Sequence, residues 1–135
     1  MSWHWESYVH KNNLWYHFGR FSEAIKGIDP IKEAIVPSVM ETDSLRIYQL
    51  RGQNTSLLWL RDQMNTWHSE LDQGIPRRVR QGIRLSAKDL GMNALPESVD
   101  IYDPWQNVWT TIKKNDLGFT VPDFRRSVVV RMHLE

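Results

Sequence analysis

The spacing of apolar residues changes its period near residue 45, and this change constrains the fold more than any other feature of the sequence. After it, short apolar or alternating segments are separated by turn residues such as Arg51-Gly52-Gln53-Asn54. Strands are expected at 45–50, 55–60, 83–87, 99–102, 108–112 and 128–134. Several short strands with turns between them predict a mainly β protein, an antiparallel sandwich or barrel. Of the two, we expect an antiparallel β-sandwich.

The first 44 residues are organised differently. Aromatic and polar residues alternate over 3–9, which predicts a short N-terminal strand with two partly covered faces. Asn12 and Asn13 are candidate N-caps of a following helix, and Gly27 stands where a left-handed residue would end it. This single amphipathic α-helix is expected because apolar residues recur at helical spacing: Leu14, Phe18, Phe21 and Ile25.

Two prolines shape the segment between that helix and the first strand after it. Asp29-Pro30 resembles an N-cap followed by proline, so 31–34 is expected to form one helical turn, which Pro37 stops. Residues 35–44 are then a connector. We therefore expect residues 1–44 to hold a strand, a helix and a connector, and residues 45–135 to form the sandwich. Residues 62–74 fit either a helical turn or a long loop.

Composition excludes several classes of protein. The chain has 135 residues, the size of one domain, and no cysteine, which excludes disulfides, cysteine-ligated zinc and thiol catalysis. A formal net charge of +1 argues against nucleic acid as the main partner. No apolar run approaches the ~20 residues that cross a bilayer. Because no secretory signal is visible either, we expect a soluble chain without a membrane partner, cytoplasmic by default.

Residues suited to catalysis or metal binding are scattered. Glu6 lies beside Trp3 and Trp5, but no second carboxylate is placed near it to complete the acid pair of a glycosidase. The candidate ligands His4, Glu6 and His10 would spread over ~20 Å along a strand, too far for one ion. We therefore expect no catalytic residue, no metal and no cofactor.

Two further features of the sequence are a run of basic residues and an excess of tryptophan. Four arginines between residues 77 and 84 could meet phosphates or acidic sugars, but they fit a solvated strand edge or loop better. Trp59 lies in an apolar run and is expected in the core. Trp67, Trp105 and Trp109 lie in or beside turns, where their rings would form a sugar-stacking platform or cap the end of the sandwich.

Several short sequence segments together resemble a known family. The stretches that resemble the last strand and last helix of a TIM-barrel glycoside hydrolase are Ser2-Trp3-His4-Trp5-Glu6-Ser7-Tyr8 and Asn13-Leu14-Trp15-Tyr16-His17-Phe18. The stretches similar to the β-sandwich tail of cellulase-like and apiosidase-like hydrolases, a tail of the type described as collagen-binding, are Tyr48-Gln49-Leu50-Arg51-Gly52, Leu58-Trp59-Leu60-Arg61-Asp62, Asn65-Thr66-Trp67 and Tyr102-Asp103-Pro104-Trp105. The resemblance covers nearly the whole chain.

The resemblance implies a protein that does not itself hydrolyse glycosides. The general acid and the nucleophile of such barrels follow their fourth and seventh strands, and no position here corresponds to either. Trp5 and Glu6 would match the aromatic lining of a sugar subsite. The implied function is a non-catalytic accessory domain, with a free-standing carbohydrate- or matrix-binding module and a glycosidase as alternatives. Because the helix would have lost its barrel, we also expect a homodimer through residues 3–25.

Overall fold

The computed structural model describes residues 5–134, with side chains from Tyr8 onward. In chain order its elements are the helical turn η1 (Trp5–His10), helix α2 (Tyr16–Ala24), strands β1 (Val36–Glu41), β2 (Leu45–Arg51) and β3 (Thr55–Asp62), the helical turn η2 (His68–Asp72), and strands β4 (Val79–Arg80), β5 (Arg84–Ser86), β6 (Ser98–Asp103), β7 (Val108–Lys113), β8 (Gly118–Thr120), β9 (Phe124–Arg125) and β10 (Ser127–His133). Residues 1–4, where the predicted strand 3–9 begins, lie outside the described part.

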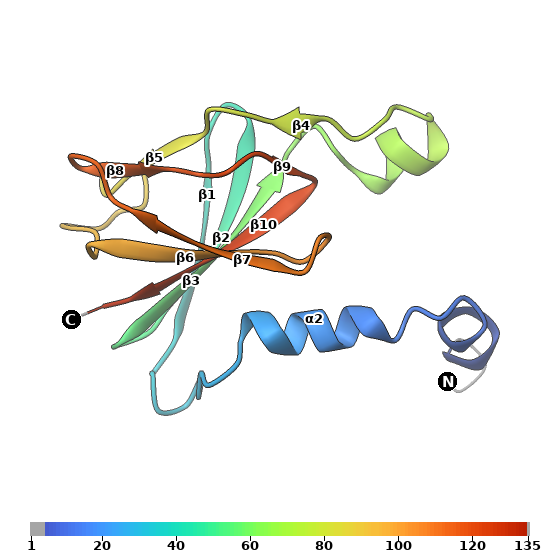
Figure 1. The fold of residues 1–135 in the computed structure, drawn as a ribbon, viewed down its shortest axis with the longest axis horizontal. Helices are drawn as coiled ribbons and strands as arrows, with labels where there is room; N and C mark the ends of the chain where they lie inside the picture. Colours follow the sequence, from blue (N-terminus) through green and yellow to red (C-terminus); the bar gives the residue numbers. More distant parts are fainter. Residues whose placement is uncertain (1–4, 135) are drawn as a thin grey trace.

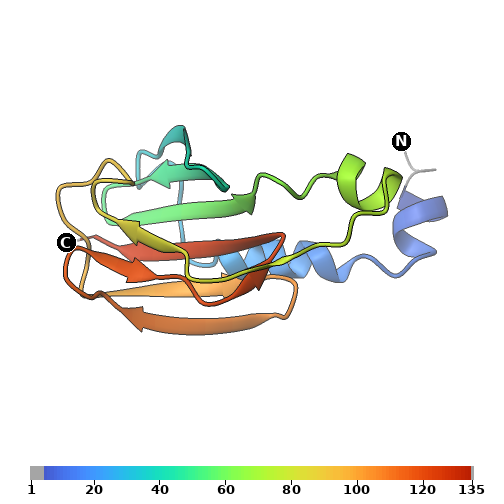
Figure 2. The ribbon, with the colours of Figure 1, turned by 90° about the horizontal axis from the view of Figure 1, so that it is seen from above.

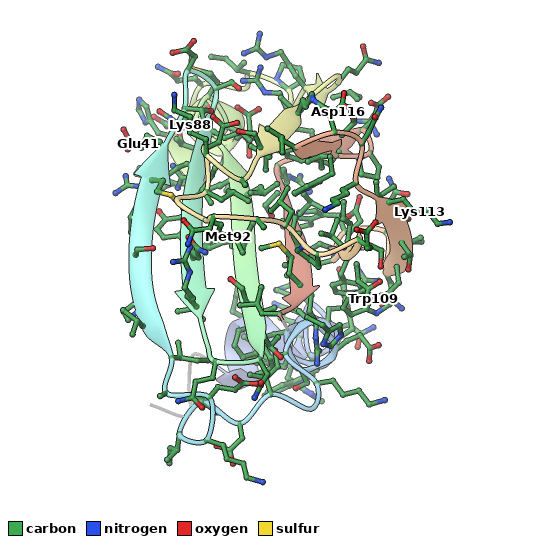
Figure 3. All side chains as sticks on the ribbon, turned by 90° about the vertical axis from the view of Figure 1, so that its left-hand side faces the viewer. Glu41, Lys88, Met92, Trp109, Lys113 and Asp116 are labelled. Carbon is green, nitrogen blue, oxygen red and sulfur yellow. The ribbon has the colours of Figure 1, made fainter. Side chains whose placement is uncertain are left out.

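Within residues 5–134, six strands form one antiparallel sheet in the order β1-β2-β3-β10-β6-β7. Two short ribbons, β4 with β9 and β5 with β8, form a second layer on one face of this sheet (Figure 1). Figure 3 shows Glu41 at the β1 edge and Lys113 at the opposite, β7 edge. The predicted mainly β, antiparallel sandwich is confirmed.

The hydrophobic core lies between the sheet and the ribbons. On the sheet side it is formed by the inward-facing residues of β2, β3, β6 and β10: Leu45, Ile47, Leu58, Leu60, Val99, Ile101, Val128, Val130 and Met132. The covering layer contributes Leu85, Ala87, Leu90, Leu95, Phe119, Val121 and Phe124. Since side chains alternate along a strand, the remaining residues of the sheet point to its other side, here called the outer face. The outer face carries Tyr48, Trp59 and Val129, which the register places side by side.

The predicted connector 35–44 is wrong, because Val36–Glu41 forms the edge strand β1. Val36 pairs with Arg51 and Glu41 with Arg46. Pro37 is tolerated because an edge strand needs only half of its backbone donors for pairing. The preceding turn is as expected, since the Asp29 carboxylate accepts hydrogen bonds from the backbone N–H groups of Ile31 and Lys32, at 3.0 and 3.2 Å.

The predicted N-terminal strand is also wrong for the described residues, because 5–10 form the helical turn η1. A strand needs a neighbour along its edge, whereas this segment bonds to itself. The N–H of Leu14 donates to the carbonyl of Val9 at 2.9 Å, and the N–H of Asn12 to that of Tyr8 at 3.0 Å. Local hydrogen bonds thus replace the pairing that a barrel strand would find in neighbours.

Helix α2 confirms the predicted helix with narrower bounds. It is followed by Gly27 in the left-handed region at φ 78°, as expected. The asparagine caps are wrong, because Trp15 occupies the N-cap position, and its side chain donates to His10 Nδ1 at 3.2 Å and does not cap the helix. An amphipathic helix usually buries its apolar stripe against the core, but this stripe is largely exposed. Phe21 is 65% exposed, and Ala24 is the one buried residue of α2.

Two segments project from the same end of the sandwich. One is η1 with the start of α2, and the other is the excursion of residues 63–78 around η2, here called the arm. Both extend beyond the strands on the right-hand side of Figure 1 and again in the perpendicular view of Figure 2.

Replacing Gly118 by alanine tests the packing of the second layer. A Cβ at this position would lie 2.6 Å from the backbone oxygen of Leu85, so we expect Gly118→Ala to lower the free energy of unfolding by about 1–3 kcal/mol in urea denaturation. Gly19, within α2, has no atom within 4 Å of the corresponding position, and Gly19→Ala should stabilise by about 0.5–1 kcal/mol. Equal effects of the two changes would contradict the described packing.

Candidate functional site

Helix α2 is attached to one half of the outer face by polar contacts. The Arg20 guanidinium donates to the carbonyls of Pro104 and Trp105, at 2.8 and 3.2 Å. The indole N–H of Trp109 donates to the Glu23 carboxylate at 3.0 Å. Since Trp109 lies on β7 and Trp105 between β6 and β7, these contacts hold α2 on the β6–β7 side of the sheet.

Next to these contacts, α2 and the outer face over β2 and β3 form an open groove, which Pro104 and Trp105 also line. The groove has a volume of about 510 Å³. Its apolar walls come from Phe21 and Ile25 on the helix side and from Leu50, Leu57 and Trp59 on the sheet side. No aspartate or glutamate is among the described residues that line it. Its lining therefore suits contact with an apolar surface and supplies no acid pair.

A stacked aromatic pair stands at this groove. Tyr48 and Trp59 are opposite each other across β2 and β3, with ring centroids 5.0 Å apart and planes at 27°. The prediction that Trp59 belongs to the core is wrong, since its side chain points to the outer face and is 45% exposed. The apolar run predicted burial of Trp59 wrongly, because side chains alternate along a strand: Leu58 and Leu60 point inward and Trp59, between them, points outward.

Two arginines face each other one row further along the same strands. Arg46 on β2 is directly opposite Arg61 on β3. The Arg46 guanidinium lies 5.5 Å from the centre of the Tyr48 ring, and its Nε is 3.7 Å from the Glu41 carboxylate. Among the described residues, the buried Nε atoms of Arg46 and Arg61 have no hydrogen-bond partner.

The predicted sugar-contacting tryptophans occupy different places. Trp105 donates its indole N–H to Ser127 Oγ at 3.2 Å, and its ring has the Arg126 guanidinium 4.6 Å from its centre. Trp109 packs on Tyr102, with ring centroids 4.9 Å apart. The structure thus brings Trp105 and Trp109 to the same helix, whereas Trp67 lies apart on the arm and is 73% exposed.

Trp5 and Glu6, the other two predicted contact residues, belong to η1 by their backbone. Their side chains lie outside the described part of the structure. Because the backbone there is helical instead of extended, the two residues do not stand on a strand as the resemblance implies.

Glu70 joins the arm to the sandwich through a network of cations. Its carboxylate accepts hydrogen bonds from Arg126 at 2.6 and 3.1 Å and from Asn65 at 2.9 Å, and Arg77 lies 3.6 Å away. These hydrogen bonds, the one from Arg126 foremost, lower the pKa of Glu70 from 4.5 to about 2. The carboxylate is therefore charged at neutral pH and holds the arm against Arg126.

Two arginines of the basic run form ion pairs within the protein. Arg77 faces Glu70, and Arg80 forms an ion pair with Asp62, which is almost fully buried. For these two arginines, the interpretation as solvated charges is replaced by a structural one. In the described part of the chain, no group of three or more histidine, aspartate or glutamate side chains is arranged to hold a metal ion.

Comparison with known proteins gives no match to a family model, to a curated protein or to a solved structure. Over residues 5–134, no helix is both long and apolar enough to span a bilayer.

The aromatic pair Tyr48–Trp59 at the groove and the arginine pair Arg46–Arg61 beside it are not among the site residues predicted from the sequence. A signal for them was present in β2, where Leu45, Ile47 and Gln49 alternate with Arg46, Tyr48 and Leu50. Aligning this alternation with β3 across the turn at 51–54 would have placed Tyr48 against Trp59.

The Glu70 network predicts a specific pH dependence of stability. Because the folded pKa of Glu70, about 2, lies below its ordinary value of 4.5, its stabilisation is complete above pH 4.5 and is lost as the pH falls from 4.5 towards 2. We expect Glu70→Gln to cost about 1–3 kcal/mol of unfolding free energy at neutral pH and almost nothing near pH 2. Urea denaturation over this pH range measures the difference.

Glu97 provides the matched control for this prediction. It is 91% exposed and 3.4 Å from Lys114, so Glu97→Gln should change the unfolding free energy by less than about 0.5 kcal/mol at any pH. A pH-independent effect of Glu70→Gln would show that its role is packing and not charge.

Proposed function

We propose that this chain is a non-catalytic accessory β-sandwich domain of a glycoside hydrolase, and that α2 and the two projecting segments pack against a catalytic TIM barrel. The observation that carries the proposal is the gathering of exposed apolar side chains at the end from which these segments project. The resemblance of residues 2–18 to the last strand and helix of such a barrel supplies the partner.

The first projecting segment is rich in exposed aromatic residues. They are Tyr8, Trp15, Tyr16 and Phe18, all at least 45% exposed, and they are followed in α2 by Phe21, which also lines the groove and is 65% exposed. Each large apolar side chain left in water forgoes roughly 1.5–3 kcal/mol of burial. A helix with such a surface is suited to lie between a sandwich and a second body, with polar contacts to the first and apolar contacts to the second.

The arm presents a second apolar surface at the same end. Its exposed apolar residues are Met64, Trp67, Leu71 and Ile75. Glu70, within the arm, is anchored to Arg126 next to β10, so this surface is fixed to the sandwich. Large exposed apolar patches on a folded domain mark interaction sites. Two such surfaces at one end support a single large partner.

Carbohydrate binding is the second candidate function, and the half-exposed stacked pair Tyr48–Trp59 is the observation that favours it. A glycosidase activity of the chain itself receives no such support. The carboxylates Glu70, Glu23 and Asp62 are engaged by Arg126, Trp109 and Arg80 respectively.

The docking proposal is tested by complementation. A panel of cellulase-like and apiosidase-like barrels, each expressed without its last strand and helix, is mixed with the full chain. We expect a stable one-to-one complex in size-exclusion chromatography with at least one barrel, together with recovery of glycosidase activity that neither component shows alone. If no barrel binds, or if the chain alone hydrolyses glycosides, the proposal is wrong.

The same surface predicts self-association of the isolated chain through residues 3–25. Light scattering at increasing protein concentration should show a dimer, because two copies cover each other's apolar side chains. Phe21→Ser should weaken this association about tenfold, which corresponds to losing roughly 1.4 kcal/mol of apolar burial. Ile31→Ser is the matched control, since Ile31 is 91% exposed but lies outside that surface. A strictly monomeric chain at all concentrations would contradict the prediction.

A further inference from the structure

We propose that the open half of the outer face, on β2 and β3, binds an acidic carbohydrate. The apolar face of a sugar ring lies against Trp59, and a carboxylate of the carbohydrate is held by Arg46 and Arg61. This inference gives a ligand class to the second candidate function and does not depend on docking to a barrel.

The stacked pair provides a rigid surface for a sugar ring. One face of the Trp59 ring is turned to Tyr48, and Trp59 also lines the groove beside α2. Because β2 and β3 are paired along their whole lengths, neither ring is carried on a mobile loop. Aromatic side chains fixed in this way contact a ligand with little loss of conformational entropy.

The arginine pair provides the charge. Like charges directly opposite each other on a sheet repel, and here the carboxylate close to the pair is Glu41, 3.7 Å from Arg46 and more than half exposed. Two guanidinium groups against one carboxylate leave a local positive charge. Both arginine side chains are partly exposed, so an anion that bridges their guanidinium groups would remove a repulsion and add charged hydrogen bonds.

The spacing of the two features defines the ligand. Arg46 and Arg61 are each two residues from Tyr48 and Trp59 along their strands, on the same face, which places them roughly 7 Å away. A carboxylate on the stacked sugar or on its neighbour in a chain lies within reach of the long arginine side chains. A small anion without a ring would use only half of the site.

A charged sugar fits this surface better than a neutral one. The groove lining is almost entirely apolar, so a neutral sugar buried in it would lose hydrogen bonds to water without replacing them. A uronic acid lying across the mouth of the groove keeps its hydroxyl groups in water and gains the arginine contacts.

Single-stranded nucleic acid also combines stacking with anionic groups, but the observations favour it less. Its binding depends on neutralising many phosphates, whereas the chain has a net charge of only +1. The proposed site needs only one sugar ring on Trp59 and one carboxylate between Arg46 and Arg61, so a carbohydrate can bind there without a wider positive surface.

The test uses the full chain and three probes. The probes are polygalacturonate, the same polysaccharide with its carboxylates methyl-esterified, and a single-stranded oligonucleotide. Binding of each probe is measured by tryptophan fluorescence and by affinity electrophoresis. We expect polygalacturonate to bind and the ester and oligonucleotide to bind at least about tenfold more weakly. Arg61→Gln and Trp59→Leu should each raise the dissociation constant for polygalacturonate about tenfold or more.

Two control variants separate the site from general effects of charge and aromatic content. Lys88→Gln removes an exposed cation from the covering layer, and Trp67→Leu removes the exposed indole of the arm, and neither should change the affinity. Circular dichroism checks that each variant is folded. Rescue of the Arg61 position by Arg61→Lys to an intermediate affinity would support the charge contact.

Three outcomes would overturn the inference. Equal binding of the methyl ester would exclude the carboxylate contact while leaving carbohydrate binding as a function. Tighter binding of the oligonucleotide would assign the face to nucleic acid. Absence of binding to every probe would exclude the inference and would leave docking to a barrel untouched.

Discussion

The antiparallel register of β2 with β3 decides what each face of the sheet presents. It places Ile47 beside Leu60 on the covered face and Tyr48 beside Trp59 on the outer face. A slip by one residue would exchange these sets and expose the core. The turn that fixes the register is supported from outside, because the Glu33 carboxylate accepts a hydrogen bond from the N–H of Asn54 at 2.7 Å and the Glu33 carbonyl one from Gln53.

Gly52 in this turn shows how little freedom the register has. A Cβ there would lie 2.8 Å from the backbone oxygen of Thr55 and from the Glu33 carboxylate. The hydrogen bond from the Gly52 N–H to the Thr55 carbonyl, at 2.8 Å, closes the turn at the same point. The outer face therefore depends on a turn that Glu33 also contacts, so the segment before β1 helps to fix the register of the sandwich.

Local patterns were sufficient for most strands, and tertiary contacts explain the errors. Alternation predicted β2, β5 and β10, because their two faces meet different environments. Pro37 concealed β1, since proline removes a backbone donor but an edge strand does not need it. Trp59 was assigned to the core because an apolar run does not reveal that only one face of its strand is covered. Local sequence also does not show that Arg126 has a backbone φ of 65°. The contacts that hold its side chain come from Glu70, 56 residues earlier, and from Trp105, 21 residues earlier.

Arg126 connects the projecting arm to the groove. A non-glycine residue in the left-handed region carries a backbone cost of order 1–3 kcal/mol, which persists only where surrounding contacts impose it. Here the carbonyl of Arg126 accepts a hydrogen bond from Asp62 N–H at 2.9 Å, while its guanidinium bridges Glu70 of the arm and the ring of Trp105. Trp105 in turn lines the groove, and its backbone carbonyl accepts a hydrogen bond from Arg20 of α2. The Arg126 side chain therefore contacts both the arm and Trp105, a residue of the groove wall. The same arginine thus fixes the apolar surface of the arm to the sandwich and packs on one wall of the groove.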